Sequence, residues 1–108
     1  MKTLLVTLAA AGTLLLATQA SALDADASKA LAQKSGCLAC HAIDKKVLGP
    51  AYKDVAAKYK GDKGAEARLV AKVKAGGGGV WGAMAMPANS PQVKDEDIKT
   101  IVQWVLTL

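Results

Sequence analysis

Hydrophobic residues recur at helical spacing in several segments of the chain, most clearly near its C-terminus. Four apolar residues there follow the i, i+3, i+4, i+7 pattern of one helix face: Ile98, Ile101, Val102 and Val105. Asp95, Glu96 and Asp97 precede this stripe, where negative charge favours the positive end of a helix dipole. The pattern predicts a C-terminal helix that buries its apolar face.

Three shorter helices are expected upstream, over residues 27–34, 51–59 and 65–75. Asp24 or Asp26 can cap the first helix, and Gly36 ends it. Pro50 is expected to open the second helix in its first position, where no N–H is needed. The glycines at 76–79 stop the third helix. Since no segment alternates with period two, the sequence predicts an all-α fold of about four short helices.

The N-terminal segment has the pattern of a secretory signal peptide. Lys2 is followed by an apolar stretch over residues 4–17, and Ala20-Ser21-Ala22 gives the small residues of a cleavage site. The stretch is short for a membrane span, and it has no charged face for an amphipathic anchor. We therefore expect residues 1–22 to be cleaved and residues 23–108 to form one domain.

Composition limits what this domain can be. With 52% hydrophobic residues and a net charge of +5, the chain is not expected to be disordered. Two cysteines exclude a disulfide-dense scaffold, and the single histidine, His41, restricts metal chemistry. A domain of this size has a thin core and gains stability from a covalent cross-link or a bound cofactor.

The motif Cys37-Leu38-Ala39-Cys40-His41 indicates such a cofactor. It is a C-x-x-C-H sequence, which is typical of c-type haem attachment. Two thiols three positions apart can add to the two vinyl groups of one porphyrin, and the adjacent imidazole can then bind the iron. The motif predicts one covalent haem c, held by Cys37 and Cys40, with His41 as an iron ligand.

The two cysteines admit three other interpretations. A thioredoxin-like motif needs a βαβ context, whereas a helix precedes these cysteines. A structural zinc site needs four ligands, and Cys37, Cys40 and His41 are three. A disulfide between Cys37 and Cys40 could form in protein that lacks the haem.

Met84 and Met86 are the soft side chains left for the sixth iron position. Methionine opposite histidine closes the iron site and raises its reduction potential. Pro87 pushes Met86 into an extended conformation, and in an extended run both methionines point to the same side. Spacing alone leaves both open, and either could instead fill the core.

Over nearly all of residues 23–108 the sequence resembles the small bacterial class I monohaem cytochromes c. Five segments carry the resemblance: residues 36–44 (GCLACHAID), 47–58 (VLGPAYKDVAAK), 79–82 (GVWG), 86–87 (MP) and 103–106 (QWVL). The resemblance implies helices wrapped around one haem, with His41 and Met86 as axial ligands. It also implies that the Pro50 carbonyl accepts a hydrogen bond from the His41 Nδ1–H, which would orient the ring.

The resemblance implies further contacts around the haem. Asn89 matches a residue that hydrogen-bonds the methionine sulfur, and Trp81 matches one whose ring N–H reaches a propionate. Packing against the ring is the alternative for Trp81. Lys72 lies where some relatives have an arginine near a propionate. A lysine keeps the charge but cannot make the paired hydrogen bonds of a guanidinium group. Residues 90–93 form a longer stretch than in close relatives, which is a departure from the family pattern.

Together these features predict a periplasmic electron carrier of a respiratory chain, not an enzyme. The resemblance implies redox partners such as a nitrite reductase, a terminal oxidase or a cytochrome peroxidase. We expect a monomer with no nucleic-acid partner and no membrane insertion after signal cleavage. The alternative is a gas-binding or peroxidase-like c-type haem protein with an open sixth position. His41 cannot serve that chemistry if it binds the iron, although a distal arginine or carboxylate could.

Two larger sets of residues complete the expectations. Seven residues are expected to pack on or near the haem: Leu31, Leu48, Val55, Leu69, Ile101, Trp104 and Val105. Eight lysines form either a basic rim that steers an acidic partner or an ordinary solvated surface: Lys45, Lys46, Lys53, Lys58, Lys60, Lys63, Lys72 and Lys74. We expect the glycines at 76–79 to allow close approach of the backbone to the ring.

Overall fold

The computed structural model describes residues 24–108, so the predicted signal peptide lies outside the described residues. Four α-helices and one short 3-10 helix follow one another: α1 (Ala25–Lys34), η1 (Cys37–Ala39), α2 (Tyr52–Lys58), α3 (Ala65–Ala75) and α4 (Asp95–Val105). Over this range the backbone makes only isolated β-bridges and no strand. The all-α prediction is therefore confirmed. No helix within these residues is long and apolar enough to cross a membrane.

The first helix is capped by Asp24, which settles the choice between the two candidate caps. Its Oδ1 atom accepts hydrogen bonds of 3.1 Å from the N–H groups of Asp26 and Ala27. These bonds satisfy two of the N–H groups that a helix start leaves free. Gly36, at φ 84°, turns the chain from α1 into the 3-10 helix.

The second helix begins later than the sequence suggested. Its first residue is Tyr52 and its cap is Ala51, so the placement of Pro50 in the first helical position is wrong. The start of α2 is bound to the preceding loop, because the Tyr52 N–H donates to the Ala42 carbonyl at 2.9 Å. Pro50 lies in the connection just before this start and leaves its own carbonyl free for a tertiary contact.

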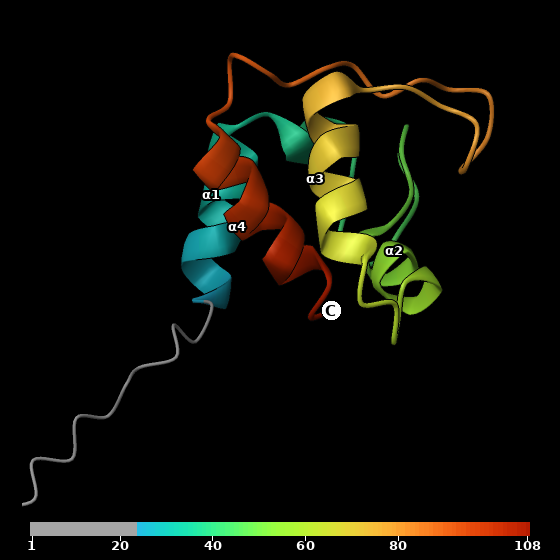
Figure 1. Cartoon of the computed structure of the whole chain (residues 1–108), viewed down its shortest axis with the longest axis horizontal. Helices are drawn as coiled ribbons and strands as arrows, with labels where there is room; N and C mark the ends of the chain where they lie inside the picture. The colour runs from blue at the N-terminus through green and yellow to red at the C-terminus, as the bar shows by residue number, and fades with distance from the viewer. Residues whose placement is uncertain (1–23) are drawn as a thin grey trace, which may run out of the picture.

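Helices α3 and α4 match their predictions, and α4 is the centre of the packing (Figure 1). It contacts α1, α2 and α3, and its buried face is the apolar stripe read from the sequence. Two polar contacts join α3 to α4. Gln103 donates to Glu66 at 2.9 Å, and Lys74 pairs with Asp95 at 2.9 Å.

Six buried residues form the core: Ala32, Tyr52, Val55, Ile101, Trp104 and Val105, with Leu31 and Leu69 packed against them. Of the residues expected to pack on or near the haem, Leu48 alone lies outside this cluster. It is 53% exposed and lies in a loop that borders a cavity. Because Leu48 lies in a loop, no helix packs over its side chain. Its apolar side chain therefore faces the space that remains open between the helices.

Candidate functional site

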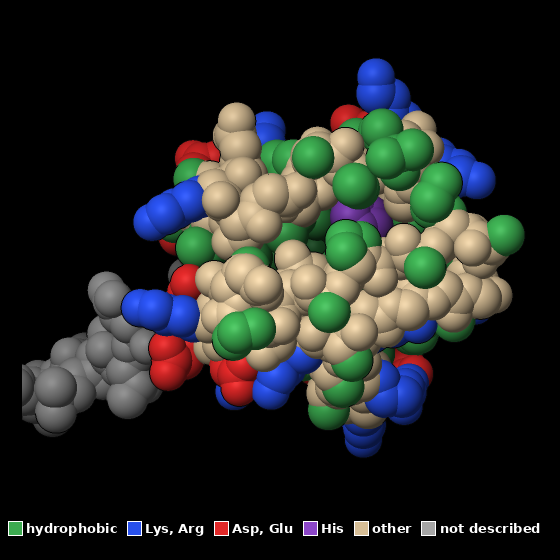
Figure 2. Space-filling view, turned by 90° about the horizontal axis from the view of Figure 1, so that it is seen from above, with side chains coloured by type: hydrophobic (Ala, Val, Ile, Leu, Met, Phe, Trp, Pro, Cys, Tyr) green, Lys and Arg blue, Asp and Glu red, His purple; other side chains and the backbone are tan. Residues whose placement is uncertain are grey.

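An apolar cavity of about 320 Å³ opens beside α3 and α4. This volume lies in the range of small-molecule and cofactor sites. Figure 2 shows the hollow, with apolar side chains around it and the His41 ring inside it. The helices contribute Val55, Leu69, Val73 and Ile101 among others to its lining, and loops contribute the remainder. The fold thus leaves a cofactor-sized space where its core would otherwise close.

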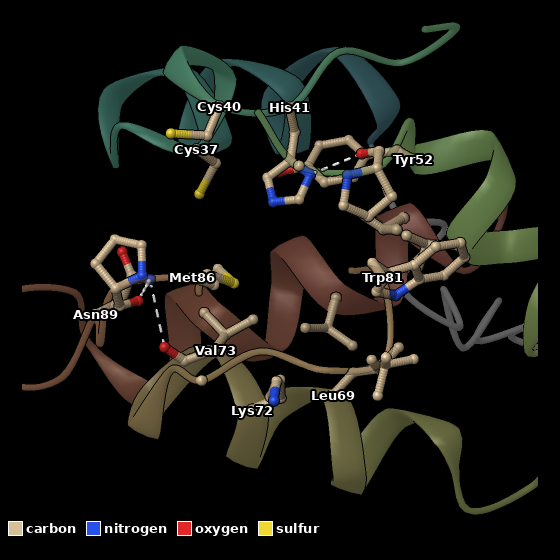
Figure 3. Close-up of a pocket in the computed structure, with 18 of the residues that line it drawn as sticks. Cys37, Cys40, His41, Tyr52, Leu69, Lys72, Val73, Trp81, Met86 and Asn89 are labelled. Atoms are coloured by element: carbon tan, nitrogen blue, oxygen red, sulfur yellow. Dashed lines mark hydrogen bonds between the residues drawn. The ribbon is translucent and has the colours of Figure 1, made fainter. Parts of the chain in front are cut away.

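Cys37 and Cys40 lie in the wall of this cavity, on and just after the 3-10 helix (Figure 3). One turn of this tight helix brings both thiols to the same wall, as the C-x-x-C spacing requires. Both cysteines are free thiols, so the disulfide considered from the sequence is not formed. Burial raises the pKa of the Cys37 thiol, and the neighbouring Tyr52 hydroxyl partly offsets this effect.

The orientation of His41 is set by a hydrogen bond to the backbone. Its Nδ1 lies 2.8 Å from the carbonyl oxygen of Pro50. Because a carbonyl only accepts, Nδ1 must carry the proton, and Nε2 is left with its lone pair. The second ring nitrogen faces the cavity in Figure 3. The ring is therefore held in the tautomer that can bind a metal through Nε2.

Aromatic packing supports the same ring from behind. His41 and Tyr52 are stacked with their centroids 4.8 Å apart, and Tyr52 meets Trp104 edge-on at 5.7 Å. Tyr52 is buried, and this burial raises the pKa of its phenol well above the ordinary value. The phenol therefore stays neutral, and the site gains no negative charge from it. No motif in the sequence marks Tyr52 as a site residue, although it follows the Gly49-Pro50 pair closely.

Met86 lies across the cavity from His41 (Figure 3). Its backbone is paired with Gly77 by two hydrogen bonds of 2.9 and 3.0 Å, which close the loop of residues 77–86 at its base. Gly76, at φ 73°, makes this closure possible, since a Cβ there would lie 2.6 Å from the Met86 carbonyl oxygen. Met84 also borders the cavity, but it is 65% exposed, whereas Met86 is half-buried.

Asn89 borders the cavity with a different set of contacts from the one that the resemblance implies. Its Nδ2 donates to the carbonyls of Val73 at 3.3 Å and Pro87 at 3.2 Å, which occupies both amide N–H groups. The hydrogen bond to the Met86 sulfur that the resemblance implies stays a prediction. The amide fastens the segment after Met86 to α3.

Trp81 and Lys72 lie along the rim of the cavity. The Trp81 side chain is 39% exposed, and the Lys58 Nζ lies 5.6 Å from its ring centroid. The Lys72 Nζ reaches the Gly78 carbonyl at 3.4 Å. Their expected contacts with propionates stay predictions. From the sequence, Lys58 is distinguishable only as one of the eight lysines of a basic surface.

The side chains around the cavity fit a covalently held haem. Two thiols, an oriented imidazole and a thioether surround an apolar space, and each can supply the bond that haem c requires. Within residues 24–108, no group of three His, Cys, Asp or Glu residues is arranged to hold a metal ion on its own. A structural zinc site therefore has no ligand set in this part of the chain.

Comparisons with known proteins agree with this geometry. Residues 25–108 match the family model described as Cytochrome c. Cytochrome c-551 of Allochromatium vinosum is 59% identical over 78 residues, which cover 72% of this chain and 82% of that protein. Cytochrome c-552 of Nitrosomonas europaea is 47% identical over 108 residues, covering 100% of this chain and 99% of that one.

A solved structure is similar in fold as well as in sequence. The crystal structure of wild-type Nitrosomonas europaea cytochrome c552 superposes with a TM-score of 0.71 at 48% identity. The match covers 74% of this chain and 98% of the other. The predicted resemblance to small class I monohaem cytochromes c is confirmed by these findings.

Proposed function

The chain belongs to the cytochrome c family, which binds haem c covalently, and from this premise we propose that it is a periplasmic electron carrier. Cys37 and Cys40 would hold the haem through thioether bonds, and His41 and Met86 would bind its iron. The observation that carries the proposal is the placement of His41 and Met86 across one apolar cavity whose wall also holds both thiols.

His41 is suited to bind the iron through Nε2. The hydrogen bond from Nδ1 to the Pro50 carbonyl fixes the ring and increases the basicity of the free nitrogen. The stacked Tyr52 ring limits rotation about the side chain. The ring would therefore hold the iron with little change of position between oxidation states, which would keep the reorganisation of the site small.

Met86 is the better of the two methionine candidates. It is half-buried, and its backbone is paired to Gly77. Met84 is 65% exposed and lies in the loop outside this pair. A ligand that stays bound in both oxidation states needs a fixed backbone, because each conformation lost on binding costs entropy. These features support Met86 as the sixth ligand.

The lining of the cavity favours electron transfer over peroxidase chemistry. When bound, haem c supplies a one-electron couple between ferric and ferrous iron. Among the described residues, those that border the cavity include no Arg, Asp or Glu, and Asn89 and Lys72 are its chief polar side chains away from His41. A peroxidase needs a distal group that moves protons. The chain instead surrounds the haem with apolar groups that exclude water.

Electrons would enter and leave at the mouth of the cavity. Four exposed apolar residues border this mouth: Leu48, Val80, Trp81 and Met84. Such a patch is suited to brief contact with another redox protein. A nitrite reductase, a terminal oxidase and a cytochrome peroxidase are the proposed classes of partner.

The lysines are proposed to steer an acidic partner toward this mouth. Of the eight, Lys53 pairs with Asp44 at 2.7 Å and Lys74 pairs with Asp95. The remaining six make no ion pair within residues 24–108. Their uncompensated charge supports long-range attraction, which raises the rate of encounter.

The optical spectrum of the purified holoprotein tests the proposal. It is recorded oxidised, reduced, and reduced under carbon monoxide. An electron carrier with His41 and Met86 on the iron gives a low-spin spectrum that carbon monoxide does not shift. A shift on adding the gas would instead support the gas-binding or peroxidase-like alternative.

A further inference from the structure

The loop of residues 77–86 crosses the mouth of the cavity with few backbone contacts to the rest of the protein. Its base is closed by the Gly77–Met86 pair, and its tip by a hydrogen bond from the Gly79 N–H to the Gly82 carbonyl. Gly77, Gly79 and Gly82 have positive φ angles, so the backbone itself is weakly restrained. In Figure 1 the chain after α3 runs outward and turns back. The position of the tip therefore depends on side chains.

Trp81 makes such a contact with Lys58. The Lys58 Nζ lies 5.6 Å from the centre of the Trp81 ring and 6.0 Å from that of Tyr59. Both distances are within the range of cation–π attraction, and tryptophan is the strongest acceptor. The other lysine near the loop, Lys72, meets the Gly78 carbonyl at 3.4 Å, beyond the usual hydrogen-bond range.

Helix α2 connects the two sides of the cavity, and Lys58 lies at its C-terminal end. Its first residue, Tyr52, stacks on His41, and its last residue, Lys58, lies over Trp81. The helix packs against α4 and is buried along Tyr52, Val55 and Ala56. It is thus a rigid connection between the histidine wall and the loop that ends in Met86.

We propose that Lys58 is a positioning residue, whose ammonium group holds the Trp81 ring against α2 and so keeps the Met86 loop closed over the cavity. The inference rests on the proposed function, because Met86 is taken as the iron ligand. Loop opening must precede replacement of Met86 by an outside ligand. Loss of the Lys58–Trp81 contact therefore speeds that replacement without changing the iron ligands at rest.

The test measures how fast imidazole binds the oxidised holoprotein at saturating concentration, where loop opening limits the rate. Lys58→Gln is expected to bind about 2- to 5-fold faster, the ratio that corresponds to an exposed cation–π contact. Lys58→Arg keeps a cation over the ring and retains the parent rate. Lys63→Gln is the control, since Lys63 is exposed and has no ion-pair or cation–π partner among the described residues.

Trp81→Leu separates the contact from a general charge effect. The Lys58→Gln change should add nothing in the Trp81→Leu background, because the acceptor ring is gone. Equal rates for Lys58→Gln and Lys63→Gln would overturn the inference, as would a Lys58 effect that persists without Trp81. Exchange of the Trp81 indole N–H, followed by NMR, should accelerate in Lys58→Gln by the same factor.

Failure of the proposed function has a different signature in this experiment. If Met86 is not the iron ligand, the parent protein either lacks a low-spin thioether spectrum before imidazole is added or has one that Met86→Ala leaves unchanged, and the inference fails with it. If the parent has that spectrum and the variants bind at equal rates, only the role of Lys58 is wrong.

Discussion

Gly49 lies so close to His41 that a Cβ atom on Gly49 would be 2.6 Å from the Cε1 atom of the ring. The next residue, Pro50, accepts the hydrogen bond from the same ring. One backbone segment therefore both makes room for the imidazole and orients it.

Gly49→Ala should destabilise the holoprotein, because the added methyl group displaces the His41 ring from its hydrogen bond. We expect a loss of about 1–3 kcal/mol in the free energy of unfolding, as for other overpacked sites. Chemical unfolding followed by haem absorbance measures it. Gly64→Ala is a matched control, since the atom nearest its added Cβ belongs to the mobile end of Arg68. Similar losses in both variants would contradict a special role for Gly49.

Met86→Ala should open the sixth iron position. The reduced variant is expected to bind carbon monoxide and shift its spectrum, whereas Met84→Ala should keep the spectrum of the parent protein. The midpoint potential of Met86→Ala should also fall, because the neutral thioether favours the ferrous state. If Met84→Ala behaves in this way and Met86→Ala does not, the two assignments must be exchanged.

Asp24→Ala removes the side-chain cap of α1. Its carboxylate accepts two backbone hydrogen bonds at the start of that helix. We expect stability to fall by about 1 kcal/mol, which lowers the melting temperature of the holoprotein. Asp26→Ala, which removes a carboxylate from the same turn without removing the cap, should cost less. Equal losses would mean that charge alone matters here.

The chain without haem should be largely unfolded. Without haem, the apolar walls of the cavity would be exposed to water, so the burial that the haem provides would be lost. The whole stability expected for a domain of this size is only about 4–13 kcal/mol, and its core is thin. Circular dichroism of a Cys37→Ala/Cys40→Ala variant purified without haem would measure the remaining helix. A cooperative thermal transition in that sample would contradict the prediction.

Electron exchange with an acidic redox partner should slow as salt is added, because screening weakens attraction from the unpaired lysines. Lys45→Gln/Lys46→Gln is expected to reduce both the rate at low salt and its salt dependence. Stopped-flow mixing with the partner measures these rates. A second-order rate that does not change with ionic strength would remove the steering role and leave the lysines as a solvated surface.

Much of the fold could be read from the sequence because its signals are local. The apolar stripe of α4, an aspartate cap before α1 and the glycines after α3 act within one or two helical turns. The haem attachment motif is local as well, since its three side chains are contiguous in one short segment. The helices and the cofactor were therefore predictable without knowledge of packing.

Tertiary structure decided the relationships between segments that are distant in the chain. The start of α2 moved past Pro50 because the backbone at Ala42 and Ile43 binds its first N–H groups. The Asn89 amide meets α3, and Lys58 meets Trp81, because loop closure brings these residues together. Spacing along the chain cannot specify such contacts, since they depend on how the helices pack around the cavity.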